Sequence, residues 1–355
     1  MEGNLKMKKI LTTLCAVAML AGCTAGGSKK SSTNTASTKE ETAATVMVGT
    51  GSVTNVSNKT KEGSDTTAQF DTTFASVVLE GNVIKYVYFD VAQDKVTYDA
   101  TGHVTSDNTA STSKKALGDK YGMKDKSSIK KEWYEQVEAL EKWAVGKTVE
   151  EVLNMPTTQK DEKHTVSADK DLMTGCTIGV TAFQQALDKA AKNAVEVKDV
   201  ASVGSAILTQ VSGKDASAEK SGEAKASSTY GVVALDKDGK VVFTQTDVAQ
   251  NAVKFTTAGV VDGEAVAIAT KGEKKDEYGM KKVSSIGKEW FEQNQAYDDW
   301  TVGKTGKEIA DMKVTTNEGG KTVTADKDLM TGCTIGVDSL QKVTTTAIEA
   351  ATKLN

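Results

Sequence analysis

The sequence predicts an α+β fold made twice in tandem, each copy a mainly antiparallel sheet with packed helices. The run ADKDLMTGCTIGV occurs at residues 168–180 and again at 325–337, an offset of 157 positions that also relates Trp133 to Trp290. In each copy, strand-like runs come first and helical patterns follow. Two copies of a buried run would be expected to differ, because cores tolerate volume-conserving exchange of apolar side chains. This run is mostly polar and yet identical in both copies, so packing alone does not explain it. The repeated run therefore marks a site.

The N-terminal residues predict a signal peptide at 1–23. Three lysines precede an apolar run at residues 10–19, which is too short for a membrane span and ends in Leu20-Ala21-Gly22-Cys23. This resembles a bacterial lipoprotein signal with its lipobox, which implies that Cys23 is lipidated. No second apolar span follows, so we expect a protein anchored by lipid to the extracellular face of the cell membrane. Met7 stays open as an alternative start.

Composition limits the rest of the chain. Residues 24–44 are almost wholly small and polar, which predicts a disordered tether. The four cysteines fall at Cys15 and Cys23 and at one position in each repeat, which excludes a disulfide scaffold. With two histidines and no paired cysteines, the chain offers no zinc, iron–sulfur or c-type haem ligands, and we predict no metal site. A net charge of −4, without a basic cluster past the tether, argues against nucleic acid.

Strand signals open each repeat, which we place at residues 45–196 and 197–355. In the second repeat, residues 230–235 and 240–245 flank Asp236-Lys237-Asp238-Gly239, a strong hairpin signal. In the first, residues 77–79 and 83–89 flank a turn that is one residue shorter. A loop rich in Ser, Thr, Asn and Gly is expected directly after residues 90–93.

Helical patterns follow the strands. A helix is predicted to open near Ser127, because an apolar stripe recurs at helical spacing. Capping boxes at 148–151 and 305–308 each predict a short helix. A third helix is predicted at 181–193, and Asp338 is expected to cap its counterpart. The two stripes are formed by Ile129, Trp133, Val137 and Leu140, and by Phe183, Leu187, Ala190 and Ala194.

The repeated run offers two hydroxyls, Thr177 and Thr334, between small residues. A threonine without an activating base is a poor nucleophile, so we predict no catalytic residue and expect modification by another enzyme. The helix that follows presents a positive dipole end and free N–H groups, where a phosphate is stabilised.

Residues 171–177 and 328–334 resemble the Asp-x-x-[Ser/Thr]-Gly-Ala-Thr flavinylation motif of FMN-binding domains, such as those of the sodium-pumping NADH:quinone reductase and Rnf complexes. In that family a flavin transferase uses a metal ion to move FMN from FAD onto the last threonine. The resemblance implies two covalent FMN groups, joined by phosphoesters to Thr177 and Thr334. The cysteines stand where the family has alanine. The other implied cofactor-binding positions are Asp171, Asp328, Thr174, Thr331, Gly175, Gly332, Cys176 and Cys333.

The whole layout resembles the FMN-carrying, pheromone-encoding surface lipoproteins of Gram-positive bacteria that serve extracellular electron transfer. This implies an electron carrier rather than an enzyme. The partners it implies are a flavin transferase, a membrane NADH dehydrogenase or the quinone pool as donor, and extracellular acceptors such as ferric iron. A Tyr-Gly-Met-Lys loop at 121–124 and 278–281 resembles the family's loop beside the flavin. It adds Tyr121, Met123, Tyr278 and Met280 to the expected site.

Several features have simpler interpretations. The tryptophans at helical spacing are expected in the core, the two cysteines as small buried side chains, and His103 and His164 on the surface. The Tyr-Gly-Met-Lys loop is equally explained by a glycine turn. Two other functions stay open: a non-redox solute-binding or adhesive lipoprotein, and a signal peptide released as a pheromone.

Overall fold

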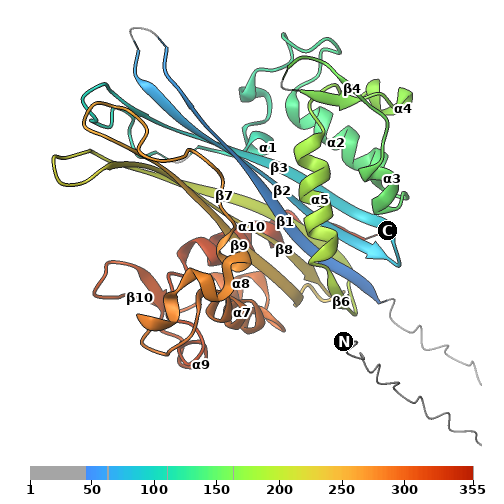
Figure 1. Ribbon diagram of the computed structural model, residues 1–355. Coiled ribbons are helices and arrows are strands. Elements are labelled where there is room, and N and C mark those ends of the chain that lie inside the picture. The colour runs from blue at the N-terminus through green and yellow to red at the C-terminus, as the bar shows by residue number, and fades with distance from the viewer. Residues whose placement is uncertain (1–44, 62–63, 110, 163, 355) are drawn as a thin grey trace, which may run out of the picture. The chain divides into compact units, whose positions relative to one another are not determined.

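Two four-stranded antiparallel sheets, one from each repeat, organise the chain (Figure 1). The computed structural model describes residues 45–354 except 62–63, 110 and 163, so the predicted signal peptide, Cys23 and tether lie outside it. The predicted α+β class is confirmed. The first sheet has the order β3-β2-β1-β6 and the second β12-β7-β8-β9. The strands are β1 Val46–Lys59, β2 Thr66–Glu80, β3 Val83–Tyr98, β6 Val195–Val197, β7 Ser202–Lys214, β8 Gly222–Leu235, β9 Val241–Phe255 and β12 Thr352–Lys353.

Both predicted hairpins are confirmed. The Asp236 carboxylate accepts hydrogen bonds from the N–H groups of Asp238 and Lys240, and Gly239 has a φ of 77°. The strands are longer than predicted, and the loop expected after residue 93 is wrong. The alternation of buried side chains continues through Val96 and Tyr98, so β3 runs to Tyr98. The chain leaves the first sheet after β6 and enters the second at β7.

The two sheets pack face to face around residues that are equivalent in the two repeats. Tyr98 stacks on Phe255 with ring centroids 3.8 Å apart, and Phe74 meets Tyr230 at 5.1 Å. Phe74 pairs with Asp90 on the next strand, and Tyr230 pairs with Asp247. Because these two aspartates are related by the offset of 157, Phe74 and Tyr230 occupy equivalent positions. Contacts between equivalent residues are the mark of two-fold symmetry. The repeats therefore pair as a pseudo-two-fold sandwich.

Helices cover the outer face of each sheet (Figure 1). Helix α5 Thr181–Lys192 packs on β1 and β2, and α10 Asp338–Glu349 packs on β7 and β8. Helices α2 Trp133–Ala144 and α7 Trp290–Thr301 pack on β3 and β9. Among the described residues, no helix is long and apolar enough to cross a membrane. The short helices are α1 Lys114–Leu117, α3 Val149–Leu153, α4 Lys170–Met173, α6 Lys271–Lys274, α8 Gly306–Ala310 and α9 Lys327–Met330, with 3-10 turns at Gly118–Tyr121, Lys275–Tyr278 and Met280–Lys282. Two ribbons, β4 Thr157–Gln159 with β5 Thr165–Ser167 and β10 Val314–Thr316 with β11 Thr322–Thr324, complete the fold.

The helix starts show where local signals hold. The capping boxes of Thr148 with Glu151 and of Thr305 with Glu308 are both formed. The helix expected near Ser127 begins six residues later, because Lys130 takes a φ of 52° and Glu135 accepts the N–H of Glu132. Ile129 thus lies outside the helix. The expectation that Asp338 is the cap is also wrong, since it is the first helical residue.

Replacing Gly204 by alanine should destabilise the protein. A Cβ at Gly204 would overlap the carbonyl oxygen of Ala347 in α10, and backbone cannot give way as a flexible side chain can. We expect a loss of about 1–3 kcal/mol from overpacking, measured by urea unfolding. The control is Gly319→Ala, where a Cβ would lie 3.4 Å from Asn317 Oδ1, an ordinary contact with a side chain. Equal midpoints for the two variants would contradict this packing.

Candidate functional site

The two copies of the repeated run fold alike. Asp169 caps α4 by accepting hydrogen bonds from the N–H groups of Asp171 and Leu172, and Asp326 caps α9 in the same way. Gly175 lies against Ala139 of α2, where a Cβ would come within 2.7 Å of the Ala139 methyl. Gly332 meets Ala296 equally closely, at 2.8 Å. The glycine therefore lets the run approach the tryptophan-bearing helix.

A buried glutamine on that helix holds each motif threonine. Gln136 Oε1 accepts hydrogen bonds from the N–H and the Oγ1 of Thr177, at 2.9 and 3.2 Å. Gln293 does the same for Thr334, at 2.9 and 3.0 Å. Gln136 is fully buried and Gln293 is 1% exposed, while both threonines are half-buried. Sequence reasoning missed these glutamines, although they share the offset of 157.

The same glutamines join the threonines to the Tyr-Gly-Met-Lys loops. Gln293 Nε2 donates to Ser284 Oγ at 3.1 Å and lies 3.5 Å from Met280 Sδ, and Gln136 repeats both contacts with Ser127 and Met123. The loop glycines have φ values of 72° and 75°, which confirms a glycine turn. The structure thus brings the loop and the motif threonine together in both repeats.

In the second repeat these residues line a cleft of about 1120 Å³. One wall is the outer face of the sheet, with Lys225, Ser227 and Gln250. The other walls are formed by residues that the sequence predicted for the site and by residues 317–323. The predicted residues on the cleft are Thr334, Tyr278 and Met280, with Trp290, Gln293 and Lys271 beside them. The volume is ample for a ligand of cofactor size.

A lysine lies over the aromatic side of each site. Lys271 Nζ is 5.7 Å from the Tyr278 ring centroid and 5.5 Å from that of Trp290. Lys114 occupies the equivalent place over Tyr121 and Trp133, at 5.2 and 5.5 Å. A cation over an aromatic face is attracted by the ring quadrupole. Each lysine is therefore fixed above the tyrosine and the tryptophan.

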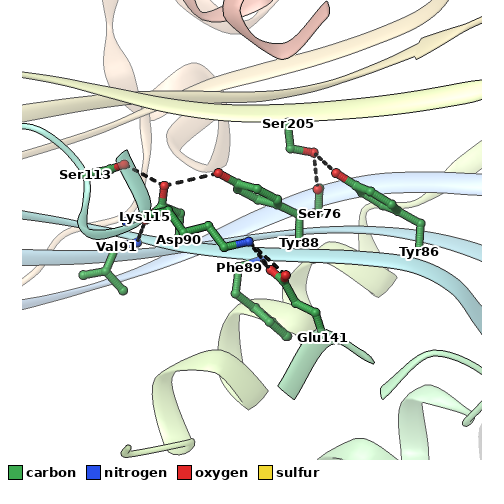
Figure 2. A network of polar contacts seen from close by, with 10 residues as sticks. All are labelled: Ser76, Tyr86, Tyr88, Phe89, Asp90, Val91, Ser113, Lys115, Glu141 and Ser205. Atoms are coloured by element: carbon green, nitrogen blue, oxygen red, sulfur yellow. Dashed lines mark hydrogen bonds and ion pairs between the residues drawn. The ribbon is translucent and has the colours of Figure 1, made fainter. Parts of the chain in front are cut away.

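Buried aspartates anchor the turns that carry these lysines. Asp90 accepts hydrogen bonds from Ser113 Oγ at 2.7 Å and from the N–H of Lys115 at 3.0 Å (Figure 2). Asp247 accepts them from Thr270 Oγ1 and from the N–H of Gly272 at 2.5 and 2.8 Å. Burial raises the pKa of both carboxyl groups, and these hydrogen bonds oppose the rise.

The first repeat adds an ion pair to this anchor. Lys115 binds Glu141 at 2.6 Å, lies 3.9 Å from the Tyr88 ring centroid, and is drawn in Figure 2 beside Asp90. Glu141 also accepts the N–H of Phe89, and burial raises its pKa to about 7. In the second repeat Gly272 and Asp298 stand at the positions of Lys115 and Glu141. The lysine and the longer acid are thus replaced together.

Lysines outnumber acidic residues in the second cleft, which is lined by Lys225, Lys271 and Lys321 and by Glu318 and Asp338. Burial, together with the charges of Lys321 and Lys225, lowers the pKa of Lys271 to about 8, while the charge of Asp247 opposes this shift. Lys225 and Lys321 line the same cleft. Three ammonium groups around one cavity attract an anionic ligand.

The remaining predicted residues fall into two groups. Cys176 and Cys333 are buried, as expected, and burial raises the pKa of each thiol to about 11. Trp133 and Trp290 are also buried, whereas Trp143 and Trp300 are half-buried, and His103 and His164 are exposed. The motif side chains that face solvent are Asp171, Thr174, Asp328 and Thr331.

Comparisons with protein-family models, with curated proteins and with solved structures found no match to this chain.

Replacing Gln293 by leucine should destabilise the site. The N–H of Thr334 and the hydroxyl of Ser284 would lose their amide partner in a buried place, which costs about 1–3 kcal/mol. Urea unfolding measures the change. Gln295→Leu on the same helix is the control, because Gln295 is exposed and its amide donates a hydrogen bond to the exposed Asp299. A variant at Gln293 as stable as this control would contradict the buried contact.

Replacing Lys271 by methionine should change how stability depends on pH. Its folded pKa of about 8 lies below the usual lysine value of 10.5, so the unfolded chain binds more protons between these pH values. The wild type therefore gains stability as pH rises from 8 to 10.5, and the variant lacks this gain. The free energy of unfolding of the variant minus that of the wild type should fall by roughly 1–3 kcal/mol over that window. A constant difference would show that Lys271 is not desolvated.

Proposed function

We propose that this protein is a lipid-anchored, extracytoplasmic electron carrier with two FMN groups, bound through phosphoesters to Thr177 and Thr334. One observation carries the proposal. In each repeat, a buried glutamine holds the motif threonine next to an aromatic loop and a lysine. In the second repeat these groups share a cleft of about 1120 Å³.

The residues of the second cleft fit FMN. Thr334 supplies the hydroxyl, Tyr278 and Trp290 supply apolar rings beside which a flat ring system can pack, and the lysines balance a phosphate or a reduced ring. When bound, the flavin supplies reversible two-electron chemistry, and the protein supplies orientation and electrostatic tuning. The cysteines pack beneath the run as neutral thiols, which suits a position where the resembling family has alanine.

Attachment requires FAD and a flavin transferase with its metal ion. The threonine Oγ forms a bond to the phosphorus of the FMN moiety, the anhydride bond of FAD breaks, AMP leaves, and the hydroxyl proton passes to a base of the transferase. Gln293 Oε1 accepts a hydrogen bond from the Thr334 hydroxyl, which orients the oxygen and does not deprotonate it. This agrees with a residue that is modified by another enzyme.

A covalent bond suits a carrier outside the cell. A noncovalent cofactor is lost when its free concentration falls below the dissociation constant, and a covalent bond removes that dependence. Each flavin would take two electrons from a membrane NADH dehydrogenase or the quinone pool. It would then pass one electron to each of two ferric ions or to another extracellular acceptor. The expected lipid on Cys23 would keep the carrier beside its donor.

A non-redox, solute-binding lipoprotein is the second candidate. The observation that favours it is the same cleft, whose three lysines suit an anionic solute bound without a covalent link. The two candidates differ in the mass of the mature chain.

The test is the intact mass of the protein after co-expression with a flavin transferase. We expect two FMN adducts on the wild type, one on Thr177→Ala, one on Thr334→Ala, and none on the double variant. Thr315→Ala, at an exposed threonine outside the repeated run, is the control and should keep both adducts. An FMN-binding domain modified in the same cells shows that the transferase is active. An unmodified wild-type chain beside that modified domain would overturn the proposal.

A further inference from the structure

The walls of the two sites differ, although the repeated run is identical. Gln69 pairs with Lys95 on the neighbouring strand, and Lys225 pairs with Ala252. Lys95 and Ala252 are 157 positions apart, so Gln69 and Lys225 are equivalent. By the same register, Asp71 of β2 corresponds to Ser227 of β8. Both positions of the second repeat line its cleft.

A carboxylate in the first repeat is thus replaced by a hydroxyl in the second. Asp71 is half-buried and accepts hydrogen bonds from the amide groups of Gln69 and Gln93, at 2.7 and 2.6 Å. In the second repeat Gln250, the equivalent of Gln93, donates to Ser227 Oγ at 3.2 Å. The hydrogen bond is kept and the negative charge is removed.

A lysine also changes place on the same wall: the first repeat has the exposed Lys95 opposite Gln69, and the second has Lys225 opposite Ala252. Lys225 is half-buried and lies 3.6 Å from Glu223, but of these two only Lys225 lines the cleft. Lys321 supplies a further charge where the first repeat has His164, which bonds Asp161 at 2.7 Å. Lys271 and Lys114 are common to both sites. The loss of the Asp71 carboxylate, the half-buried place of Lys225 and the charge of Lys321 each make the second site more positive.

Other differences act in the opposite direction. Asp338, Val283 and Asn317 line the second cleft where the first repeat has Thr181, Lys126 and Lys160. All three positions are exposed in both repeats, and solvent and salt screen exposed charges. The charges of Asp71 and Lys225 are half-buried and are screened less. The half-buried residues of the sheet wall therefore decide which site is the more positive.

Resting on the proposed function, we infer that the flavin on Thr334 has a higher reduction potential than the flavin on Thr177, so that electrons pass from the first repeat to the second. Reduction makes the flavin more negative. Lys225 would stabilise the reduced group in the second repeat, and Asp71 would destabilise it in the first. In the transfer, the flavin on Thr177 loses two electrons and is oxidised, the flavin on Thr334 gains them, and solvent exchanges the protons.

The experiment uses full-length chains with one flavin each. Thr177→Ala retains the flavin on Thr334, and Thr334→Ala retains the flavin on Thr177. Intact mass first establishes one adduct on each variant, and a spectroelectrochemical titration then measures each potential. At equal applied potential we expect a ratio of reduced to oxidised flavin at least tenfold higher on Thr334. For a two-electron couple this corresponds to about 30 mV.

Charge variants test the cause. Lys225→Gln in the Thr177→Ala chain should lower the potential, and Asp71→Asn in the Thr334→Ala chain should raise it, each by a severalfold change in the same ratio. Asparagine keeps an oxygen for the glutamine amides of the wall. Lys237→Gln, at an exposed hairpin turn, removes the same charge outside the cleft and should leave the potential unchanged.

The outcomes separate the two proposals. Single-adduct chains with equal or reversed potentials, or potentials that do not respond to Lys225 and Asp71, would overturn the inferred direction and leave the flavin assignment intact. Chains without adduct would overturn the flavin assignment and with it the inferred direction.

Discussion

The face-to-face contact of the two sheets is the constraint on which the rest of the fold depends. It pairs equivalent residues, Tyr98 with Phe255 and Phe74 with Tyr230, and occupies the inner face of each sheet. Helices must then pack on the outer faces. Strand β8 has 14 residues and extends about 46 Å, whereas α10 has 12 residues and extends about 18 Å. A helix of that length cannot cover the whole strand, and the cleft lies along the uncovered part, with Lys225 and Ser227 on its wall.

Signals that act over a few residues predicted the fold well. The hairpin turn at Asp236 and the capping boxes at Thr148 and Thr305 formed as expected, because their hydrogen bonds join residues that are close in sequence. Strand length was underestimated, because polar residues such as Lys225 and Ser227 line the cleft and resemble the composition of a loop. The start of α2 was misplaced because the positive φ of Lys130 has no sequence signal in a lysine.

The site was predicted only in part, for a physical reason. The repeated run and the Tyr-Gly-Met-Lys loop are local patterns, so Thr334 and Met280 could be named from the sequence. Gln293 could not, since a glutamine within a helix usually faces solvent, and only the tertiary contact with Thr334 shows its role. The one usable signal was its recurrence with Gln136 at the offset of 157, which the tryptophans of the same helices share. Lys225, Lys271 and Lys321 come from three separate elements and form no sequence pattern.

The constraint on sequence differs between regions of the fold, and this explains where the two repeats diverge. At the sandwich interface a residue of one repeat contacts the equivalent residue of the other, so the two must remain complementary in shape. In the buried anchor, losing one partner of the Lys115 and Glu141 pair would leave an uncompensated charge. The second repeat has exchanged both: Gly272 lacks the charge, and Asp298 accepts hydrogen bonds from the N–H and hydroxyl of Thr246, with its pKa raised well above the usual value by burial. The cleft walls face solvent and have no such partner across the sandwich. They can change one residue at a time, which lets a symmetric core support two sites of unequal charge.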